Sequence, residues 1–394
     1  MNSNNTKHVA LAFPVAVPWL ALCMQGIINY SQRHGSWNLL TSPPTSTGTH
    51  ETALTAESLI GWPGDGIIAA ISDQSEAHYA KQLGIPIVNL AATIPNLPFP
   101  RVVVDHYKVG RVAADHLLQR GFQNLGFYGF HDPWYAQERL RGFRDRVAEA
   151  GLDCAVLEQP THEAAILPWQ ERYALLNQWL KTLKLPVGIF AVHDYHARIL
   201  IDQCNMLGLK VPLDVAVVGT DNDTIVCEHC QPTLSSVARN PLENGYKAAA
   251  LLDQLMAGRT PAKREIFLPP EGVIERGSTD TIVVDDPHVR TVVYYMRDHF
   301  QEMLDVEQLS AQVPISRRLL EKRFRQALDC TPHTYLCRLR VDAAKKLLIS
   351  SPRTKIHSIA KACGFSNQDH MRLVFLRILG MTPKEYRGSE GKKG

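Results

Sequence analysis

Two pairs of short amphipathic helices follow one another near the C-terminal end of the 394-residue chain. The first pair lies within residues 305–324, where Ser316 is placed to cap the second helix. Its apolar residues recur at helical spacing and are expected to face inward, namely Leu309, Val313, Leu319, Leu320 and Phe324. Two helices joined by a tight turn form a helix-turn-helix unit, whose second helix can lie in the major groove of DNA.

The second pair repeats this pattern about 50 residues further on. A short apolar helix is expected to end at Gly364, and Phe365-Ser366 opens the next helix. The residues expected to be buried are Ile356, Ile359, Ala360, Met371, Val374 and Phe375. A single pair of this kind is a weak signal. Two pairs joined by a connecting helix over Tyr335–Leu348 indicate a DNA-binding domain.

The distribution of charge favours the same interpretation. From Val284 onward the chain has 20 Lys and Arg against 12 Asp and Glu, a surplus of +8. The remainder has 22 against 27, which gives −5 and agrees with the net charge of +3. A basic C-terminal part on an otherwise acidic chain is typical of a protein that contacts phosphates.

The stretch from about Val289 to Arg387 resembles the DNA-binding domain of the AraC/XylS family. The segment from Gly364 to Arg387 follows that family's C-terminal signature closely. The family usually has a basic residue where this chain has Leu373, and the nearest cation is Arg372. The resemblance therefore predicts that the second unit contacts DNA differently, or more weakly, than the family pattern implies.

The side chains expected at the DNA lie near the start of each second helix. In the first unit these are Arg317, Arg318, Glu321 and Lys322. In the second unit they are Gln368, Asp369, His370 and Arg372. Arginine can bond guanine through two hydrogen bonds, and glutamine can do the same for adenine, so these residue types can read base edges.

The composition is that of an ordinary globular protein, with 45% apolar residues. No apolar run reaches the roughly 18 residues of a membrane-spanning helix, so no membrane partner is expected. The segment Val9–Met24 superficially resembles a signal peptide, but Pro14 and Pro18 interrupt it. A strand over residues 8–13 and a helix over Trp19–Arg33 explain it better, and a cytoplasmic protein is expected.

Eight irregularly spaced cysteines are expected to be reduced thiols. Cys227 and Cys230 enclose a histidine, which could suggest zinc. No second pair of ligands completes the four that a structural zinc site needs, so we expect neither a metal nor another cofactor.

Before Val284, short apolar runs alternate with amphipathic helices, which implies parallel sheets covered by helices on both faces. The expected strands are His8–Phe13, Gly66–Ala70, Ile87–Leu90, Arg101–Val104, Asn124–Tyr128, Val187–Val192 and Val215–Val218. The expected helices include Val109–Arg120, Gln137–Ala150, Trp169–Leu183 and Ala197–Leu207. About 270 residues of this pattern favour two lobes with a ligand site in the cleft between them.

Polar and aromatic residues lie where these strands end. The candidates are Asp194, Asp221, Arg139, Trp134, Tyr135 and Trp19. Carboxylates and guanidinium groups bond vicinal hydroxyls, and aromatic rings cover the apolar face of a pyranose, so the set suits a sugar. An Asp at a strand end is often only a helix cap, and Trp19 and Trp134 could be ordinary packing residues.

Residues from about His8 to Ser278 resemble the ligand-binding domain of the LacI/GalR and periplasmic sugar-binding superfamily. The matching pieces are Gly64–Ile68, Val104–Gly110 with His116-Leu117, Glu138–Phe143, Ala191–Asp194, Val218–Asn222 and Pro232–Val237. The resemblance implies that Arg139, Asp194 and Asp221 contact the sugar in the second lobe. His193 stands where the superfamily more often has Asn. In the first lobe Trp19, Ser72 and Asp73 are the candidates.

The expected fold is a two-lobed α/β periplasmic-binding-protein-like (type I) sensor, followed by an all-α domain with two helix-turn-helix units. The sensor covers residues 1–278, with lobe 1 at about 7–104 and 238–264 and lobe 2 at about 105–237 and 265–278. A linker at 279–287, the DNA-binding domain at 288–388 and a tail at 389–394 follow.

A LacI-like sensor followed by an AraC-type domain resembles a group of sugar-responsive transcription regulators. That resemblance implies D-xylose or a related sugar as effector, double-stranded operator DNA, a homodimer, and RNA polymerase if the protein is an activator. Another sugar or a purine stays possible as the ligand, since few substitutions change a pocket's specificity. The main alternative function is that of a sugar-active enzyme, but the sequence has no dinucleotide fingerprint, P-loop or nucleophile elbow.

Overall fold

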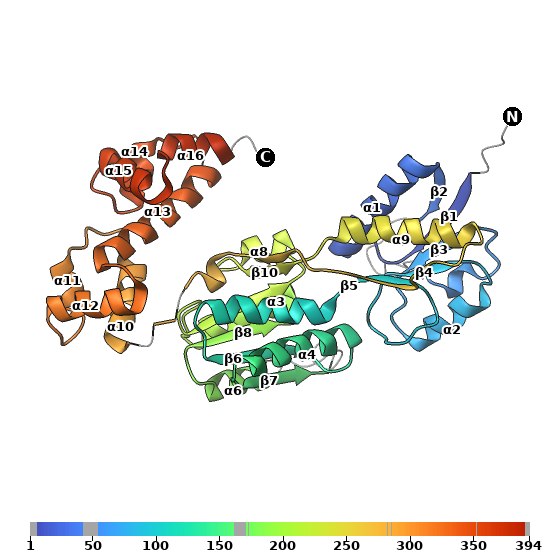
Figure 1. The fold of residues 1–394 in the computed structure, drawn as a ribbon, viewed down its shortest axis with the longest axis horizontal. Helices are drawn as coiled ribbons and strands as arrows, with labels where there is room; N and C mark the ends of the chain where they lie inside the picture. The colour runs from blue at the N-terminus through green and yellow to red at the C-terminus, as the bar shows by residue number, and fades with distance from the viewer. Residues whose placement is uncertain are drawn as a thin grey trace. The chain divides into compact units, whose positions relative to one another are not determined.

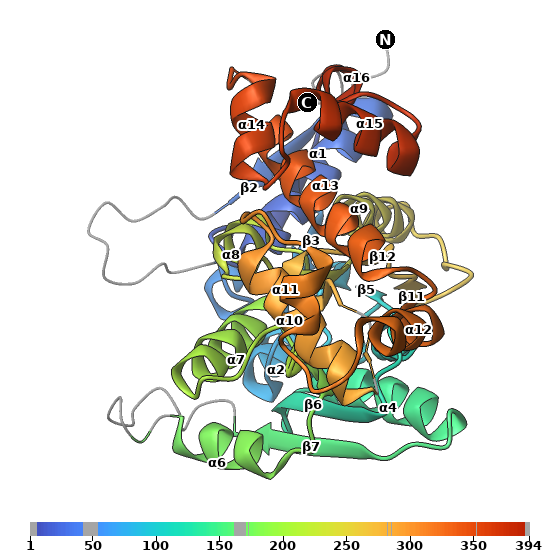
Figure 2. The same cartoon turned by 90° about the vertical axis from the view of Figure 1, so that its left-hand side faces the viewer.

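The computed structural model describes residues 6–41, 54–160, 171, 173–281, 283–284, 286–351 and 353–390. The chain forms two compact units, Met1–Ile282 and Val283–Gly394 (Figures 1 and 2), which are described separately below. The boundary between the units falls inside the linker predicted at 279–287. The start of the helix predicted at Trp169 and residues 391–394 of the predicted tail lie outside the described residues.

The first unit contains two six-stranded sheets, each of which forms one lobe. The first sheet has the strand order β11-β5-β4-β3-β1-β2, and the second has β12-β10-β9-β8-β6-β7. The first is built from β1 (Lys7–Ala12), β2 (Trp37–Leu40), β3 (Gly66–Ala69), β4 (Ile87–Asn89), β5 (Arg101–Val104) and β11 (Glu265–Leu268). The second is built from β6 (Asn124–Phe130), β7 (Cys154–Gln159), β8 (Val187–Ala191), β9 (Val215–Thr220), β10 (Ser235–Ala238) and β12 (Gly272–Ile274).

In the first lobe, alternate residues of β1 face opposite sides of the sheet. Val9 and Leu11 pack against α1 (Pro18–His34) and α9 (Pro241–Met256) on one face. Ala10 and Ala12 pack on the other face against α2 (Gln74–Gln82) and the short 3-10 helix η1 (Glu57–Leu59). Because a strand's side chains alternate, a run that is apolar at every position is buried on both faces.

The second lobe follows the same plan. On one face, α3 (His106–Gln119) and α4 (Trp134–Glu149) lie side by side. On the other face Ile189 packs in one cluster with residues of α6 (Ala174–Thr182), α7 (Asp194–Met206) and α8 (Thr224–His229). The 3-10 helix η3 (Gly277–Thr279) follows β12. The antiparallel β12 lies at the edge of an otherwise parallel sheet.

The expected α/β fold with two lobes is confirmed, and all seven expected strands are present within a few residues of their expected ends. One lobe assignment was wrong. Residues 265–278 were placed wholly in the second lobe, but β11 pairs in parallel with β5 of the first sheet, from Glu265 with Arg101 to Leu268 with Val104. The remaining part, β12, does belong to the second sheet.

The second unit consists of helices in its described part. They are α10 (Pro287–His299), α11 (Val306–Ser310), α12 (Arg317–Leu328), α13 (Pro332–Ser350), α14 (Ile356–Ala362), α15 (Gln368–Leu379) and α16 (Pro383–Glu390). The pairs α11–α12 and α14–α15 are the two expected helix-turn-helix units, and α13 is the expected connecting helix. Leu336 of α13 packs in the core of the first pair, while Val341 packs in the core of the second.

Three local expectations about this unit have clear outcomes. Ser316 caps α12, since its side chain accepts a hydrogen bond from the backbone of Leu319. Leu319 itself was expected to face inward, which is wrong: its side chain is 37% exposed, while Leu320 and Phe324 fill the core. The helix α15 begins at Gln368 rather than at Phe365, because the side chain of Asn367 caps the later position.

Candidate functional site

A cavity of about 160 Å³ lies between the two lobes of the first unit. First-lobe residues from α1, α9 and the ends of β4 and β5 line one side. Second-lobe residues from α3, α4, the segment between β8 and α7 and the end of β9 line the other. The lining residues are Trp19, Leu90, Ala91, Ala92, Thr93, Val103, Val104, His106, Tyr135, Arg139, His193, Asp221, Arg239 and Asn244. The cavity thus lies at the carboxyl ends of strands, where open α/β sheets bind ligands.

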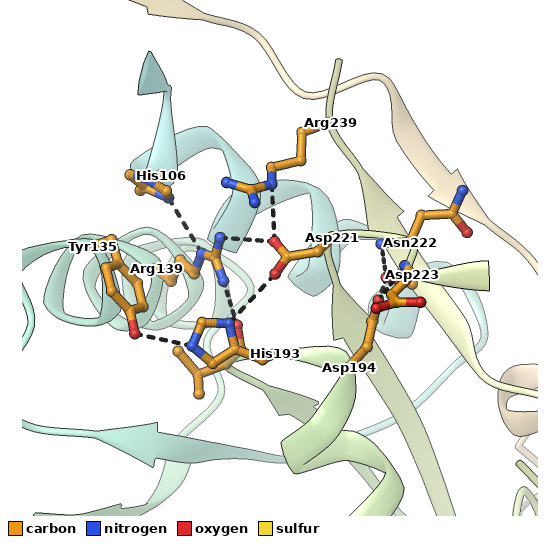
Figure 3. Close-up of polar contacts among 11 residues, drawn as sticks. His106, Tyr135, Arg139, His193, Asp194, Asp221, Asn222, Asp223 and Arg239 are labelled. Atoms are coloured by element: carbon orange, nitrogen blue, oxygen red, sulfur yellow. Dashed lines mark hydrogen bonds and ion pairs between the residues drawn. The ribbon is translucent and has the colours of Figure 1, made fainter. Parts of the chain in front are cut away.

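Asp221 is the central polar group of this cavity (Figure 3). It follows β9 directly and has a positive φ of 108°, a conformation that non-glycine residues seldom adopt. Its Oδ1 lies 3.3 Å from Nη2 of Arg139 and 2.9 Å from Nε of Arg239. Burial alone would raise the pKa of Asp221, but the Arg239 and Arg139 guanidinium groups hold it well below its usual range. The carboxylate is therefore ionised at neutral pH.

Arg139 is almost wholly buried and is fixed by partners on several sides. Its Nε donates to Nδ1 of His106 over 3.3 Å, and its Nη1 donates to the carbonyl oxygen of Val192. The guanidinium carbon lies 5.3 Å from the centre of the Tyr135 ring. Fixed in this way, the guanidinium group keeps its orientation without a ligand, which lowers the entropic cost of binding one.

Two histidines of the cavity are neutral at pH 7. Burial lowers the pKa of His193 and lowers that of His106 well below its usual value. Nε2 of His193 lies 2.9 Å from the hydroxyl of Tyr135, and its Nδ1 lies 3.5 Å from Oδ2 of Asp221. This arrangement fits the tautomer with its proton on Nδ1, in which the ring donates toward Asp221 and accepts from Tyr135.

Arg239 joins the two lobes at the cavity. It lies in the segment between β10 of the second lobe and α9 of the first. Its guanidinium pairs with Asp221, and its guanidinium carbon lies 4.6 Å from the ring centre of Trp19 on α1. The sequence reasoning missed Arg239. The available signal was its place directly after the strand in the Pro232–Val237 motif, but a cation after a short strand is usually solvated.

Four of the predicted ligand residues line the cavity: Trp19, Tyr135, Arg139 and Asp221. Asp194 does not. It is buried where its carboxylate accepts hydrogen bonds from Oγ of Ser236 at 2.6 Å and from the backbone nitrogen of Asp223 at 2.8 Å. Burial and the neighbouring Asp221 raise the pKa of Asp194 to about 7. In this structure Asp194 supports the loop that follows Asp221.

The other three predicted residues also lie away from this cavity. Trp134 stacks against Arg101, whose guanidinium carbon is 4.4 Å from the ring centre. Asp73 caps α2 by accepting from the backbone of Glu76 over 2.8 Å. Ser72 and Asp73 are exposed and line a second cavity of about 340 Å³ in the first lobe, at the ends of β1 and β3.

In the second unit, the predicted base-reading residues of α12 have different surroundings. Arg317 is exposed but forms ion pairs with Glu307 and, at 3.0 Å, with Glu321. Arg318 and Lys322 are exposed on the outer side of the helix. These two cations are therefore better placed to meet DNA than Arg317 and Glu321, which already bond each other.

On α15, Gln368, Asp369 and Arg372 are exposed at the N-terminal half of the helix. His370 is partly buried, and its Nδ1 lies 3.0 Å from Oγ of Ser366. Burial and nearby cations, Arg340 first among them, lower the pKa of His370, so the ring is neutral at pH 7. This helix presents three of its four predicted residues to solvent.

Within the part of the chain that the structure describes, no group of three or more His, Cys, Asp or Glu is placed to hold a metal ion. Cys227 and Cys230 are buried free thiols, and burial raises the pKa of each. No helix among the described residues is both long and apolar enough to cross a bilayer.

Comparisons with known proteins agree with this division of the chain. Residues 13–171 match the periplasmic binding proteins and sugar binding domain of the LacI family, and residues 114–279 match a periplasmic binding protein-like domain. Residues 309–389 match a helix-turn-helix domain. These matches confirm a sensor of the expected fold followed by the expected DNA-binding domain.

The relatives carry the same architecture over most of their length. The xylose operon regulatory protein of Escherichia coli strain K12 is 34% identical over 335 residues, which cover 83% of this chain and 84% of that protein. Its counterpart from Haemophilus influenzae is 30% identical over 82% of this chain and 84% of that protein. The solved structure of a xylose-binding transcription activator is 30% identical, covers 98% of both chains and has a TM-score of 0.78.

These relatives regulate transcription, which confirms the expectation of a DNA-binding regulator rather than an enzyme. These alignments run through both the sensor and the DNA-binding domain, and not through one domain alone. The chain belongs to the family of the xylose operon regulatory proteins.

Proposed function

We propose that the cavity between the lobes binds D-xylose, and that the bound sugar controls how the second unit binds operator DNA. The observation that carries this proposal is the position of Asp221, an ionised carboxylate between the guanidinium groups of Arg139 and Arg239. The relatives are named for xylose, which selects this pentose from the sugars that such a site could take.

Each group of the cavity has a role that suits a polyol. Asp221 accepts hydrogen bonds from neighbouring hydroxyls, and Arg139 and Arg239 donate to hydroxyl oxygens from two directions. The ring of Trp19 covers the apolar C–H face of the sugar. Asn244 of α9 is buried and adds an amide from the first lobe. Since these groups come from both lobes, the sugar stabilises the closed arrangement of the lobes.

The remaining parts of the proposal concern the partners. The protein acts in the cytoplasm as a homodimer on double-stranded operator DNA, and as an activator it recruits RNA polymerase. The basic surplus of the second unit supports the DNA contact. The sugar acts by binding the DNA-competent state more tightly than the other state, since only a difference in affinity can shift an equilibrium.

Calorimetric titration of the purified full-length protein tests the effector. D-xylose is compared with its epimers, with L-arabinose and D-ribose, and with a purine. Saturable binding of D-xylose at a lower dissociation constant than the epimers supports the proposal. If another sugar binds more tightly than D-xylose, that sugar is the effector, and the cavity is still the sugar site. Absence of binding to every sugar contradicts the assignment of the cavity itself.

A further inference from the structure

The outer face of α15 carries two leucines that the described residues of the second unit leave partly exposed. Leu373 is 59% exposed and Leu376 is 37% exposed. Asp369 and Arg372 lie on the same face, since the four residues are spaced at helical intervals. The opposite face is buried in the core through Met371, Val374 and Phe375.

The corresponding helix of the first unit has a different outer face. There Arg318, Lys322 and Arg325 are exposed, a cationic set that suits phosphates and guanine. Leu319, on the first turn of that helix, is 37% exposed. Leu373 lies in the second turn of α15, on the same face as the exposed Leu376. The two units therefore present different chemistry at equivalent helices.

We propose that Leu373 reads thymine in the operator by contacting its C5 methyl group. In the major groove thymine presents a methyl group that no other base of ordinary DNA carries. An exposed apolar side chain on the same helix face as Arg372 gains free energy when it covers that methyl group. The second unit thus selects A·T pairs by apolar contact, whereas the first unit selects by its cations.

DNA is the occupant of this face for two reasons. Leu373 shares one helix face with Arg372 on a unit that has 20 Lys and Arg against 12 Asp and Glu from Val284 onward. Two leucines on one helix also make a much smaller apolar patch than the several hundred Å² typical of a protein-docking surface. The inference rests on DNA binding by the second unit and does not depend on which sugar is the effector.

The test removes the methyl group from DNA and the leucine from the protein. The operator is first located by footprinting with the full-length protein, with and without D-xylose. Each thymine of the protected region is then replaced singly by deoxyuridine, which lacks only the methyl group. Affinities are measured for the wild type, Leu373→Ala and the matched control Leu319→Ala, whose side chain is also exposed on a recognition helix.

At one or two positions, deoxyuridine is expected to weaken binding by the wild type roughly fourfold, the change expected for exposing about one methyl group. Leu373→Ala binds the unmodified operator more weakly by a similar factor, and deoxyuridine at the same positions has no further effect. Leu319→Ala keeps the full sensitivity there. Thermal melting of the variants checks that the exposed substitutions leave the fold intact.

Three outcomes overturn the inference. The wild type could tolerate deoxyuridine at every position, or Leu373→Ala could lose as much affinity as the wild type at the sensitive positions. Alternatively, Leu373→Ala could bind DNA normally but fail to activate transcription, which would make this face a polymerase contact. If D-xylose changes none of these affinities, the proposal that D-xylose is the effector is wrong. The deoxyuridine measurements still decide whether Leu373 contacts thymine.

Discussion

Arg276 donates a hydrogen bond from Nη2 to Oδ1 of Asn222 over 2.8 Å. Asn222 directly follows Asp221 of the cavity, and Arg276 directly precedes η3, which lies near the end of the first unit at Ile282. Thr279 of η3 is itself buried, with its Oγ1 2.8 Å from Nε2 of His116. The loop that carries the central carboxylate is thus bonded to the segment through which the chain leaves the sensor.

Replacing this arginine is expected to separate sugar binding from the DNA response. Arg276→Ala removes the bond to Asn222, and a lost hydrogen bond of this kind is worth about 1–3 kcal/mol. We expect sugar affinity to change less than about tenfold, while most of the sugar-dependent change in operator affinity disappears. Titration with sugar and operator-binding assays measure the two effects. The exposed Arg259 provides the control variant Arg259→Ala, for which both quantities stay at wild-type values.

Loss of the central ion pair is expected to abolish the sugar response. Asp221→Ala leaves the buried guanidinium group of Arg139 and the partly buried one of Arg239 without their carboxylate, and Arg139→Ala removes a buried donor. Each change costs a few kcal/mol, which weakens sugar binding by two or more orders of magnitude. Calorimetry measures the loss, and salt-dependent DNA binding stays largely intact. A wild-type response in either variant would remove that residue from the proposed site.

Asp73→Ala is the matched control for these two variants. Its carboxylate caps α2, so the substitution costs about 1 kcal/mol of stability. Because Asp73 lies outside the cavity between the lobes, sugar affinity is expected to stay within about threefold of the wild type. A hundredfold loss would return Asp73 to the list of sugar contacts that the sequence suggested.

The sequence predicted the central part of the cavity because those residues follow strands within recognisable motifs. Arg139 and Asp221 were found in this way. Asp194 follows a strand in the same manner, yet it turns toward Ser236 and Asp223 instead of the cavity. A position along the chain defines which end of the sheet a residue occupies. It does not define the direction of its side chain, which depends on hydrogen-bond donors from distant segments.

Asp194 is expected to make stability depend on pH. Its pKa is raised from an unfolded value near 3.8 to about 7, so the folded protein binds more protons than the unfolded chain between these values. Its contribution to stability is therefore present at low pH and falls as the pH rises from about 4 to about 7. Asp194→Asn lacks this titration, so relative to it the wild type loses roughly 2–4 kcal/mol across that window.

Urea unfolding of both proteins at pH 5, 6, 7 and 8 measures this difference. Buried histidines with lowered pKa values, such as His116 and His196, also make stability depend on pH because they take up protons on unfolding, but they are common to both proteins and cancel in the comparison. Unfolding free energies that keep a constant difference from pH 5 to pH 8 would show that Asp194 is ionised throughout.

Base reading is expected to depend more on the first unit than on the second. Arg318→Ala should reduce the preference for operator over random DNA by about 1–3 kcal/mol, because arginine discriminates guanine through paired hydrogen bonds. Gln368→Ala should cost less. Lys345→Ala, on α13, should at most weaken binding to both DNAs alike through a phosphate contact. Competition against random DNA at two salt concentrations ranks the three variants, and a larger loss at Gln368 than at Arg318 would reverse the order.

Leu319 and β11 show why other parts of the structure escaped prediction. From periodicity alone, Leu319 at the edge of the apolar face of α12 could be either buried or exposed. Packing against the neighbouring helices buries Leu320 and leaves Leu319 partly exposed. The short strand Glu265–Leu268 had no local sign of its partner. Its pairing with β5 depends on a contact across more than 150 residues of sequence, which no local pattern contains.

Operator affinity with and without saturating D-xylose, at one fixed salt concentration, tests the central claim most directly. A sugar that favours the DNA-competent state must change that affinity, and coupling energies of about 1–3 kcal/mol correspond to roughly 5-fold to 150-fold. We expect a change in this range for the wild type and none for Asp221→Ala. Equal operator affinity of the wild type in the two conditions would contradict control of DNA binding by the sugar.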